Sequence, residues 1–164
     1  MPRYPRIEDD LHRQLMQVAP SHHGELVYRP CLVTLDDGVR VDCVYLVPEG
    51  PWARVWRTWP EEVPAAQWLD VRRVVAIADS PHRLPPRIAD KIYEAGESGP
   101  GYYLFALRFQ DGGSQAYLAG QAVDFVELPT GRTEAEIIDV RPHEGREEEN
   151  VRRGLEYRWC PFGE

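Results

Sequence analysis

The sequence predicts an α+β fold dominated by antiparallel β-hairpins, with two or three short helices. Residues 25–48 and 102–128 each contain two runs of strand-forming residues joined by a turn with aspartate and glycine. Such a turn is a strong hairpin signal because glycine accepts a positive φ. The helical patterns outside these regions are short and amphipathic, which completes the prediction of a mixed fold.

The first predicted element is an amphipathic helix over residues 7–18. Ile7, Leu11 and Leu15 follow the spacing of one helix face. Pro20 lies just beyond and cannot continue a helix. We therefore expect this helix to pack one apolar face on the first hairpin.

The first hairpin is predicted to have strands at Leu26–Leu35 and Val39–Val47, joined by the turn Asp36–Gly38. Alternate residues of the second run are expected to share one face of the strand, namely Val39, Val41, Cys43, Tyr45 and Val47. The run Leu69–Ala78 is rich in valine and is predicted to be a further buried strand.

The second half of the chain repeats this order of elements. A helix is predicted to start at Pro85-Pro86 and to end before Gly96, since proline suits the first turn and glycine the position after the last. The second hairpin has its turn at Asp111–Gly113, and Glu136–Val140 is a further strand candidate. The apolar last residues are expected to dock on the body.

These similarities leave two interpretations of the domain organisation. The chain is expected to form one compact unit over residues 1–164. A subdivision would place a first β-meander with the N-terminal helix in 1–83 and a helix with a second meander in 84–164, each SH3-like or Sm-like in outline. An internal duplication would also explain why Asp70-Val71 and Asp139-Val140 occur at similar places in the two halves. The alternative to a duplication is a coincidence among common turn residues.

The charge of the chain restricts its partners. The formal net charge is −8 at pH 7, which argues against binding nucleic acid because phosphates require a concentrated basic surface. An acidic surface is compatible with a basic protein partner. No apolar run is long enough for a membrane span, so we expect no membrane partner, and the sequence does not predict the oligomeric state.

The compartment is expected to be the cytoplasm of a bacterium. The N-terminal residues are charged and are not followed by an apolar core, so a signal peptide is not predicted. Three cysteines without close pairs fit a reducing environment.

Histidines provide the first candidate for chemistry. If the repeat is real, His82 and His143 could converge, with Asp79 and Glu144 nearby in sequence, as an acid/base or metal cluster. Polar loop histidines without a shared site are the alternative. These four residues are the candidate catalytic set of a small enzyme.

The loop from Gly96 to Gly101 provides a second candidate. Its residues Glu97, Ser98 and Gly99 could contact a small ligand. A serine nucleophile is disfavoured because Pro100 stands where a G-x-S-x-G elbow has its last glycine, and because this loop runs from helix to strand. A tight connection is the alternative.

No metal site and no cofactor are predicted. The histidines lack the spacing that places two ligands on one helix face. With the turn at Asp36–Gly38, Cys31 is expected to lie opposite Cys43 as a pair of small buried side chains. A zinc site there would need two more ligands.

Two sets of residues are candidates for protein binding. Trp52 and Trp56 could form an exposed binding surface, since tryptophan is enriched at interface hot spots, or they could belong to the core. Glu147, Glu148 and Glu149 form the densest acidic run, which could attract a basic partner or act only as a solvated loop.

Five segments of the chain resemble an uncharacterised family of bacterial proteins. The segments are Pro30–Leu35, Ile88–Gly99, Gly101-Tyr102, Gln115–Tyr117 and Ala122–Phe125. The resemblance covers about residues 25–145, and the family has methionine where this chain has Pro100. It implies no activity, cofactor or partner.

The preferred function is a non-enzymatic, protein-binding role in the bacterial cytoplasm, most concretely that of a toxin-neutralising immunity protein. This rests on the acidic charge and on the lack of a catalytic motif. The alternatives are a small enzyme that uses His82 and His143, and a small-ligand-binding protein that uses the loop from Gly96 to Gly101.

Overall fold

The computed structural model describes residues 1–62 and 67–164. It confirms the α+β fold with antiparallel hairpins, and strands predominate over helices. The chain divides into a first unit, Met1–Arg83 with Glu156–Glu164, and a second unit, Leu84–Leu155. The observed division falls where the sequence suggested one, but Glu156–Glu164 belongs to the first unit.

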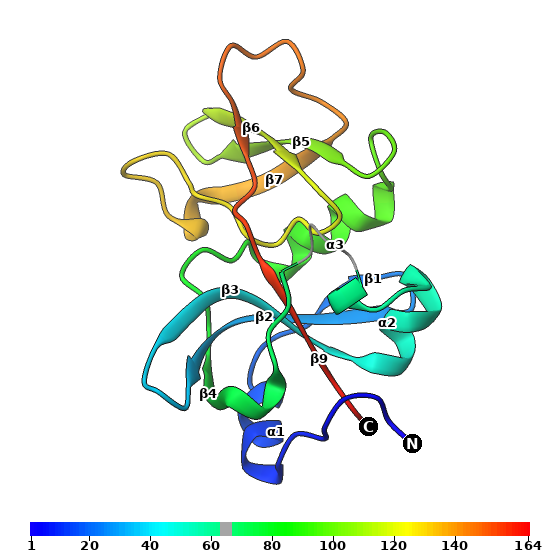
Figure 1. Cartoon of the computed structure of the whole chain (residues 1–164). Coiled ribbons are helices and arrows are strands. Elements are labelled where there is room, and N and C mark those ends of the chain that lie inside the picture. The colour runs from blue at the N-terminus through cyan, green and yellow to red at the C-terminus, as the bar shows by residue number, and fades with distance from the viewer. Residues whose placement is uncertain (63–66) are drawn as a thin grey trace. The chain divides into compact units, whose positions relative to one another are not determined.

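The first unit is built around a five-stranded mixed sheet (Figure 1). Its elements are α1 (Asp9–Met16), β1 (Ser21–His23), β2 (Leu26–Leu35), β3 (Arg40–Pro48), α2 (Glu49–Trp56), β4 (Val74–Ala78) and β9 (Arg158–Phe162). The long strand β2 is central, because β1 and β4 pair along one side of it and β3 pairs along the other. The last strand, β9, runs parallel to β3.

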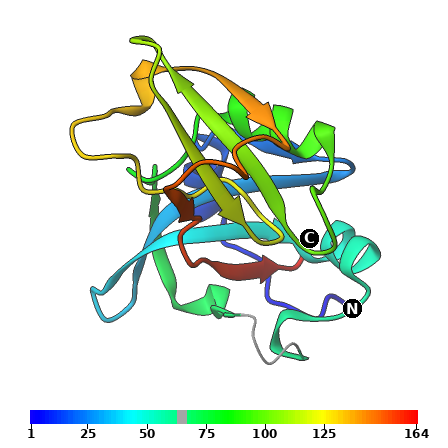
Figure 2. The ribbon, with the colours of Figure 1, turned by 90° about the horizontal axis from the view of Figure 1, so that it is seen from above.

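The second unit contains a four-stranded mixed sheet, seen from above in Figure 2. Its elements are α3 (Pro86–Ala95), β5 (Tyr103–Phe109), β6 (Ser114–Ala119), β7 (Ile137–Pro142) and β8 (Val151–Arg153). Strand β5 pairs antiparallel with both β6 and β7, and β8 runs parallel to β6.

Both predicted hairpin turns are confirmed, and they are closed in the same way. In the first, the Asp37 carboxylate accepts a hydrogen bond from the Val39 backbone N–H at 3.0 Å. In the second, Asp111 accepts from Gly113 at 2.8 Å. Gly38 has a φ of 85°, a conformation that residues with a Cβ rarely adopt.

The two sheets follow one strand order, β4-β2-β3-β9 in the first unit and β7-β5-β6-β8 in the second. A 3-10 turn, at Val71–Arg73 and at Glu134–Glu136, precedes the strand that follows each hairpin, β4 in the first unit and β7 in the second. In each unit this strand pairs with the first strand of the hairpin, whereas in a simple meander it would pair with the second. This shared order is the strongest structural support for an internal duplication.

The observed registers change which residues correspond between the units. Val74 pairs with Leu35, and Ile137 pairs with Phe109, each beside a register shift. The two Asp-Val pairs therefore do not correspond, because Asp139 lies within β7, whereas Asp70 precedes a 3-10 turn. The predicted strand Leu69–Ala78 is shorter than expected for the same reason: the Asp70 carboxylate accepts a hydrogen bond from the Arg72 backbone N–H and caps that turn.

The two hairpins differ in the register of their strands at one point. The first shifts register between Cys31 and Val33, so that Asp42 and Cys43 together lie opposite Leu32 as a β-bulge. The second pairs without a shift from Tyr103 to Arg108. Cys31 consequently pairs with Val44, and the prediction that it lies opposite Cys43 was wrong because the extra residue moves the register by one.

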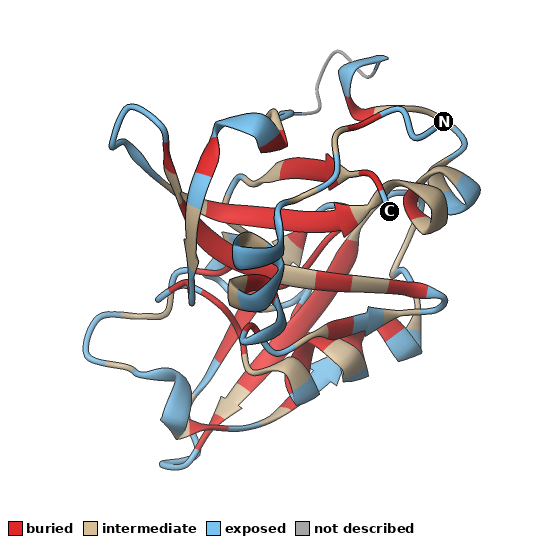
Figure 3. Cartoon of the chain, turned by 90° about the horizontal axis from the view of Figure 1, so that it is seen from below, coloured by how far each residue is buried: buried red, intermediate tan, exposed pale blue. Residues whose placement is uncertain are grey.

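Each sheet has a buried interior of apolar side chains, and Figure 3 shows the central strands as mostly buried. In the first unit, Leu15, Val33 and Val44 form part of one core cluster. Trp159 and Cys160 of the last strand are also buried, as expected for the apolar end of the chain. Within the described ranges, no helix has both the length and the apolar character that a membrane span requires.

Candidate metal-binding site

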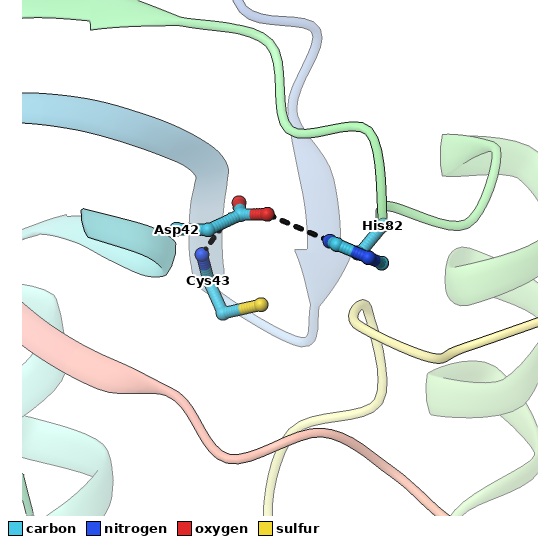
Figure 4. A group of neighbouring side chains, drawn as sticks. All are labelled: Asp42, Cys43 and His82. Carbon is cyan, nitrogen blue, oxygen red and sulfur yellow. Dashed lines mark hydrogen bonds and ion pairs between the residues drawn. The ribbon is translucent and has the colours of Figure 1, made fainter. Parts of the chain in front are cut away.

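The bulge in β3 brings two polar side chains to one place. Cys43 adopts a left-handed backbone conformation with a φ of 59°, which is uncommon for a residue with a side chain. The carboxylate of the preceding residue, Asp42, accepts a hydrogen bond from the Cys43 backbone N–H at 2.7 Å. This turn of the backbone places both side chains on the side of the strand where His82 lies (Figure 4).

His82 lies in the loop that follows β4. Its backbone N–H donates to the hydroxyl of Ser80, a buried residue, at 3.1 Å. Its Nδ1 lies 2.7 Å from Oδ2 of Asp42. A carboxylate can only accept, so we assign the proton of this contact to Nδ1.

Asp42, Cys43 and His82 form a compact group of three different donor atoms. One carboxylate oxygen, the thiol sulfur and one imidazole nitrogen all lie within 4.8 Å of one another. The side chains of His82 and Asp42 are 45% and 25% exposed, whereas Cys43 is buried. The group is therefore reached by solvent from the His82 side and closed on the Cys43 side.

The protonation of the group follows from its surroundings. Burial alone would raise the pKa of Asp42, but hydrogen bonds from Ser80, His82 and the Cys43 backbone outweigh that effect and lower it. Burial, reinforced by the Asp42 charge, raises the pKa of the Cys43 thiol to about 12. At neutral pH the group is thus a carboxylate and a neutral thiol, and Cys43 is a poor nucleophile because a thiolate is required.

This donor set suits a borderline transition-metal ion. Zn²⁺ is bound in proteins by carboxylate oxygen, thiolate sulfur and imidazole nitrogen. Three protein ligands leave one position of a tetrahedral ion open to solvent. The carboxylate and the thiolate, once the thiol loses its proton, supply two negative charges to balance a divalent ion.

The other members of the predicted histidine site lie apart along the chain. His82 and Asp79 belong to the first unit, and His143 and Glu144 belong to the second. Each histidine has a hydrogen-bond partner within its own unit, Asp42 for His82 and Ser98 for His143. The shared site stays a prediction.

The loop from Gly96 to Gly101 is closed by its own hydrogen bonds. The Ser98 hydroxyl accepts from the Leu104 backbone N–H at 2.8 Å and lies 2.8 Å from Nδ1 of His143. The Nε2 of His143 lies 3.1 Å from the Ala95 carbonyl, which can only accept, so Nε2 carries a proton. Ser98 therefore ties the loop to β5 and to the end of β7.

Glu97 and Gly99, the neighbours of Ser98 in the chain, also stabilise this loop conformation. The carboxylate of Glu97 accepts from the Gly101 backbone N–H at 2.6 Å. A Cβ on Gly99 would come 2.3 Å from the ring of Tyr102, so the close approach of this ring requires glycine. These contacts favour the tight-connection interpretation, and the ligand role of Glu97, Ser98 and Gly99 stays a prediction.

The two predicted tryptophans pack in the first unit. Trp52 is buried, and its ring lies 5.8 Å from that of Trp159 and 6.1 Å from that of Trp56. Trp56 is half-buried. This packing favours the core interpretation that the sequence left open.

The three glutamates of the acidic run, Glu147, Glu148 and Glu149, differ in their contacts. Glu148 accepts hydrogen bonds from the Ala116 backbone N–H at 3.1 Å and from the Ser114 hydroxyl at 3.3 Å, which ties it to β6. Glu147 and Glu149 are exposed. Only these two remain available to a partner.

Asp42 is the functional candidate that sequence reasoning missed. Alternation along the second strand predicted that Cys43 shares a face with Val41 and Tyr45, which would point Asp42 away. The bulge breaks this alternation, and no glycine marks it in the sequence. Comparison with known proteins gives no further guidance, because no family model matches the chain and no curated protein or solved structure is significantly similar to it.

Proposed function

We propose that this chain is a metal-binding protein whose first unit binds a divalent transition-metal ion such as Zn²⁺ through Asp42, Cys43 and His82. The observation that carries the proposal is the mutual distance of the three donor atoms, all within 4.8 Å. The bulge that creates this group has no counterpart in the hairpin of the second unit. The strand order does not require it, which favours a role for the side chains that it repositions.

The charges around Asp42, Cys43 and His82 affect how tightly these residues would bind a metal ion. Arg83 is buried next to His82 in the chain and donates to the Ser21 hydroxyl at 3.0 Å. Its positive charge opposes a cation, while Asp42 and an ionised Cys43 favour one. Binding must also displace the proton of a thiol with a raised pKa. If Nδ1 of His82 is the ligand, the proton that it donates to Asp42 must move to Nε2, because a protonated ring nitrogen cannot coordinate an ion. We therefore expect weaker binding than at a four-ligand structural zinc site, with an affinity that rises with pH.

Isothermal titration of the full chain with Zn²⁺ tests the proposal. We expect one ion per chain, and we expect Asp42→Asn and His82→Ala each to weaken binding at least about tenfold. Matched controls are Asp36→Asn in the first turn and His22→Ala in β1, both at exposed positions, which should bind like the parent. Equal binding by all four variants would refute the proposed ligands.

The second candidate is the protein-binding role predicted from the sequence, with an immunity protein as its concrete form. The observation in its favour is that Glu147 and Glu149 are exposed. A basic protein partner in a bacterial cytoplasm would be attracted to them. Charge reversal at both positions should slow its association and flatten the salt dependence, whereas unchanged kinetics would count against this surface.

A further inference from the structure

The first unit contains a pocket that the metal group does not use. It has a volume of about 470 Å³ and lies among α1, β2, β3, β9 and the segment before α1. Leu15, Val27, Leu46 and Phe162 supply apolar walls. The size falls within the range of small-molecule sites, which is roughly 300–1,000 Å³.

Arg29 is the one charged residue of the pocket wall that is not fully exposed. It is half-buried, whereas Arg6, Asp9, His12 and Glu164 stand at the exposed rim. Its Nη1 donates to the Val18 carbonyl at 2.6 Å. No carboxylate among residues 1–62 and 67–164 forms an ion pair with it, and burial lowers the pKa of its guanidinium.

A half-buried, unpaired guanidinium beside apolar walls is a costly arrangement. A charge loses hydration when it is buried, and a nearby anion restores part of the lost free energy. Guanidinium has five N–H donors, and a carboxylate can accept two of them side by side. The Val18 carbonyl uses only one of these donors.

We propose that this pocket binds a small amphipathic carboxylate, with the carboxylate on Arg29 and the apolar body against Leu15, Val27 and Leu46. An inorganic phosphate fits less well, since only one inner cation is present and most of the wall is apolar. A simple alcohol would fill the apolar part but leave the charge of Arg29 unpaired. The proposal does not depend on the metal site, because the pocket contains none of its ligands.

Titration calorimetry with decanoate, held below its micelle concentration, tests this proposal on the full chain. We expect one site, and decanol, which has the same chain length, should bind at least about tenfold more weakly because it cannot pair with the guanidinium. Arg29→Met should reduce decanoate affinity to that of decanol. Arg6→Met, which removes a rim cation of the same type, should change decanoate affinity less than about twofold.

A second variant keeps the test decisive if Arg29→Met does not fold. Val27→Phe retains Arg29 and fills part of the pocket, so decanoate binding should weaken while far-ultraviolet circular dichroism stays unchanged. Equal affinities for decanoate and decanol would overturn the assignment of Arg29. Decanoate binding that survives both Arg29→Met and Val27→Phe would show that the ligand binds elsewhere. Tight binding of a peptide carboxyl terminus, together with no binding of decanoate, would exclude a small-molecule pocket.

Discussion

The Nδ1 atom of His82 lies 2.7 Å from Oδ2 of Asp42, although 40 positions separate the two residues in the chain. The contact joins the bulge in β3 to the loop after β4. It positions the imidazole beside the Cys43 thiol and so completes the group of three donor atoms. In metal sites, a fixed imidazole binds more tightly because less rotational freedom is lost on binding.

Replacing Arg57 by glycine should stabilise the protein. Arg57 follows α2 with a φ of 56°, and this left-handed conformation costs a residue with a side chain about 1 kcal/mol. We expect Arg57→Gly to raise the free energy of unfolding by about 0.5 kcal/mol, because the greater flexibility of glycine in the unfolded chain offsets part of the gain. Urea denaturation measures the change.

The matched control is Arg54→Gly within the same helix. Arg54 is exposed and its contact with Glu25 is long, at 3.6 Å, so the lost ion pair contributes little. Glycine inside a helix costs about 1 kcal/mol relative to good helix formers. Arg54→Gly should therefore destabilise the protein, and a loss of stability in both variants would contradict the account of Arg57.

Replacing Ser98 by alanine should destabilise the second unit. The hydroxyl accepts from the Leu104 backbone N–H and contacts His143, so its removal leaves these groups without their partner at a cost of about 1–3 kcal/mol. Ser114→Ala, which removes an exposed hydroxyl that contacts Glu148 at 3.3 Å, should cost much less. Equal losses in urea denaturation would contradict the structural role of Ser98.

Stability should fall at alkaline pH because two phenols are buried. Burial raises the pKa of Tyr103 and of Tyr117 to about 12, above the value of about 10 in an unfolded chain. The folded state thus holds these protons more tightly. The associated stability is fully present below pH 10 and is lost as the pH rises toward 12, by about 1 kcal/mol for each phenol near pH 11.

Tyr117→Phe provides the check on this pH dependence. It removes the hydrogen bond from the hydroxyl to the Glu127 carbonyl, so it should lower stability by about 1 kcal/mol at pH 8. It should then lose less stability than the parent between pH 9 and pH 11. The free energy of unfolding of both proteins is measured by urea denaturation at each pH. If it falls equally in the two proteins as the pH rises, Tyr117 does not contribute to the loss of stability at alkaline pH.

The hairpins could be predicted from the sequence because their signals are local. Asp36–Gly38 and Asp111–Gly113 carry their turn chemistry within a few residues, and the alternation on either side fixes the strands. The bulge at Asp42 and Cys43 has no such signal. It depends on how β2 pairs with β3, which is a non-local property, and one extra residue reverses the faces of a strand.

The candidate site was missed for the same reason. Its residues come from a bulge and from a loop 40 positions away, and neither Asp-Cys nor Pro-His is a metal-binding motif by spacing. The position of β9 in the sheet could not be predicted from the sequence either. Its apolar composition predicted docking, but only the structure shows that it runs parallel to β3 in the first unit.

The absorption spectrum of the Co²⁺-loaded protein tests the metal-binding proposal most directly. A cobalt ion bound by the Cys43 sulfur should give a near-ultraviolet charge-transfer band that saturates at one equivalent. The band should disappear in Cys43→Ser and persist in Cys31→Ala, which alters a buried cysteine outside the group. No band in the parent protein, or an unchanged band in Cys43→Ser, would contradict the assignment of Asp42, Cys43 and His82 as a metal site.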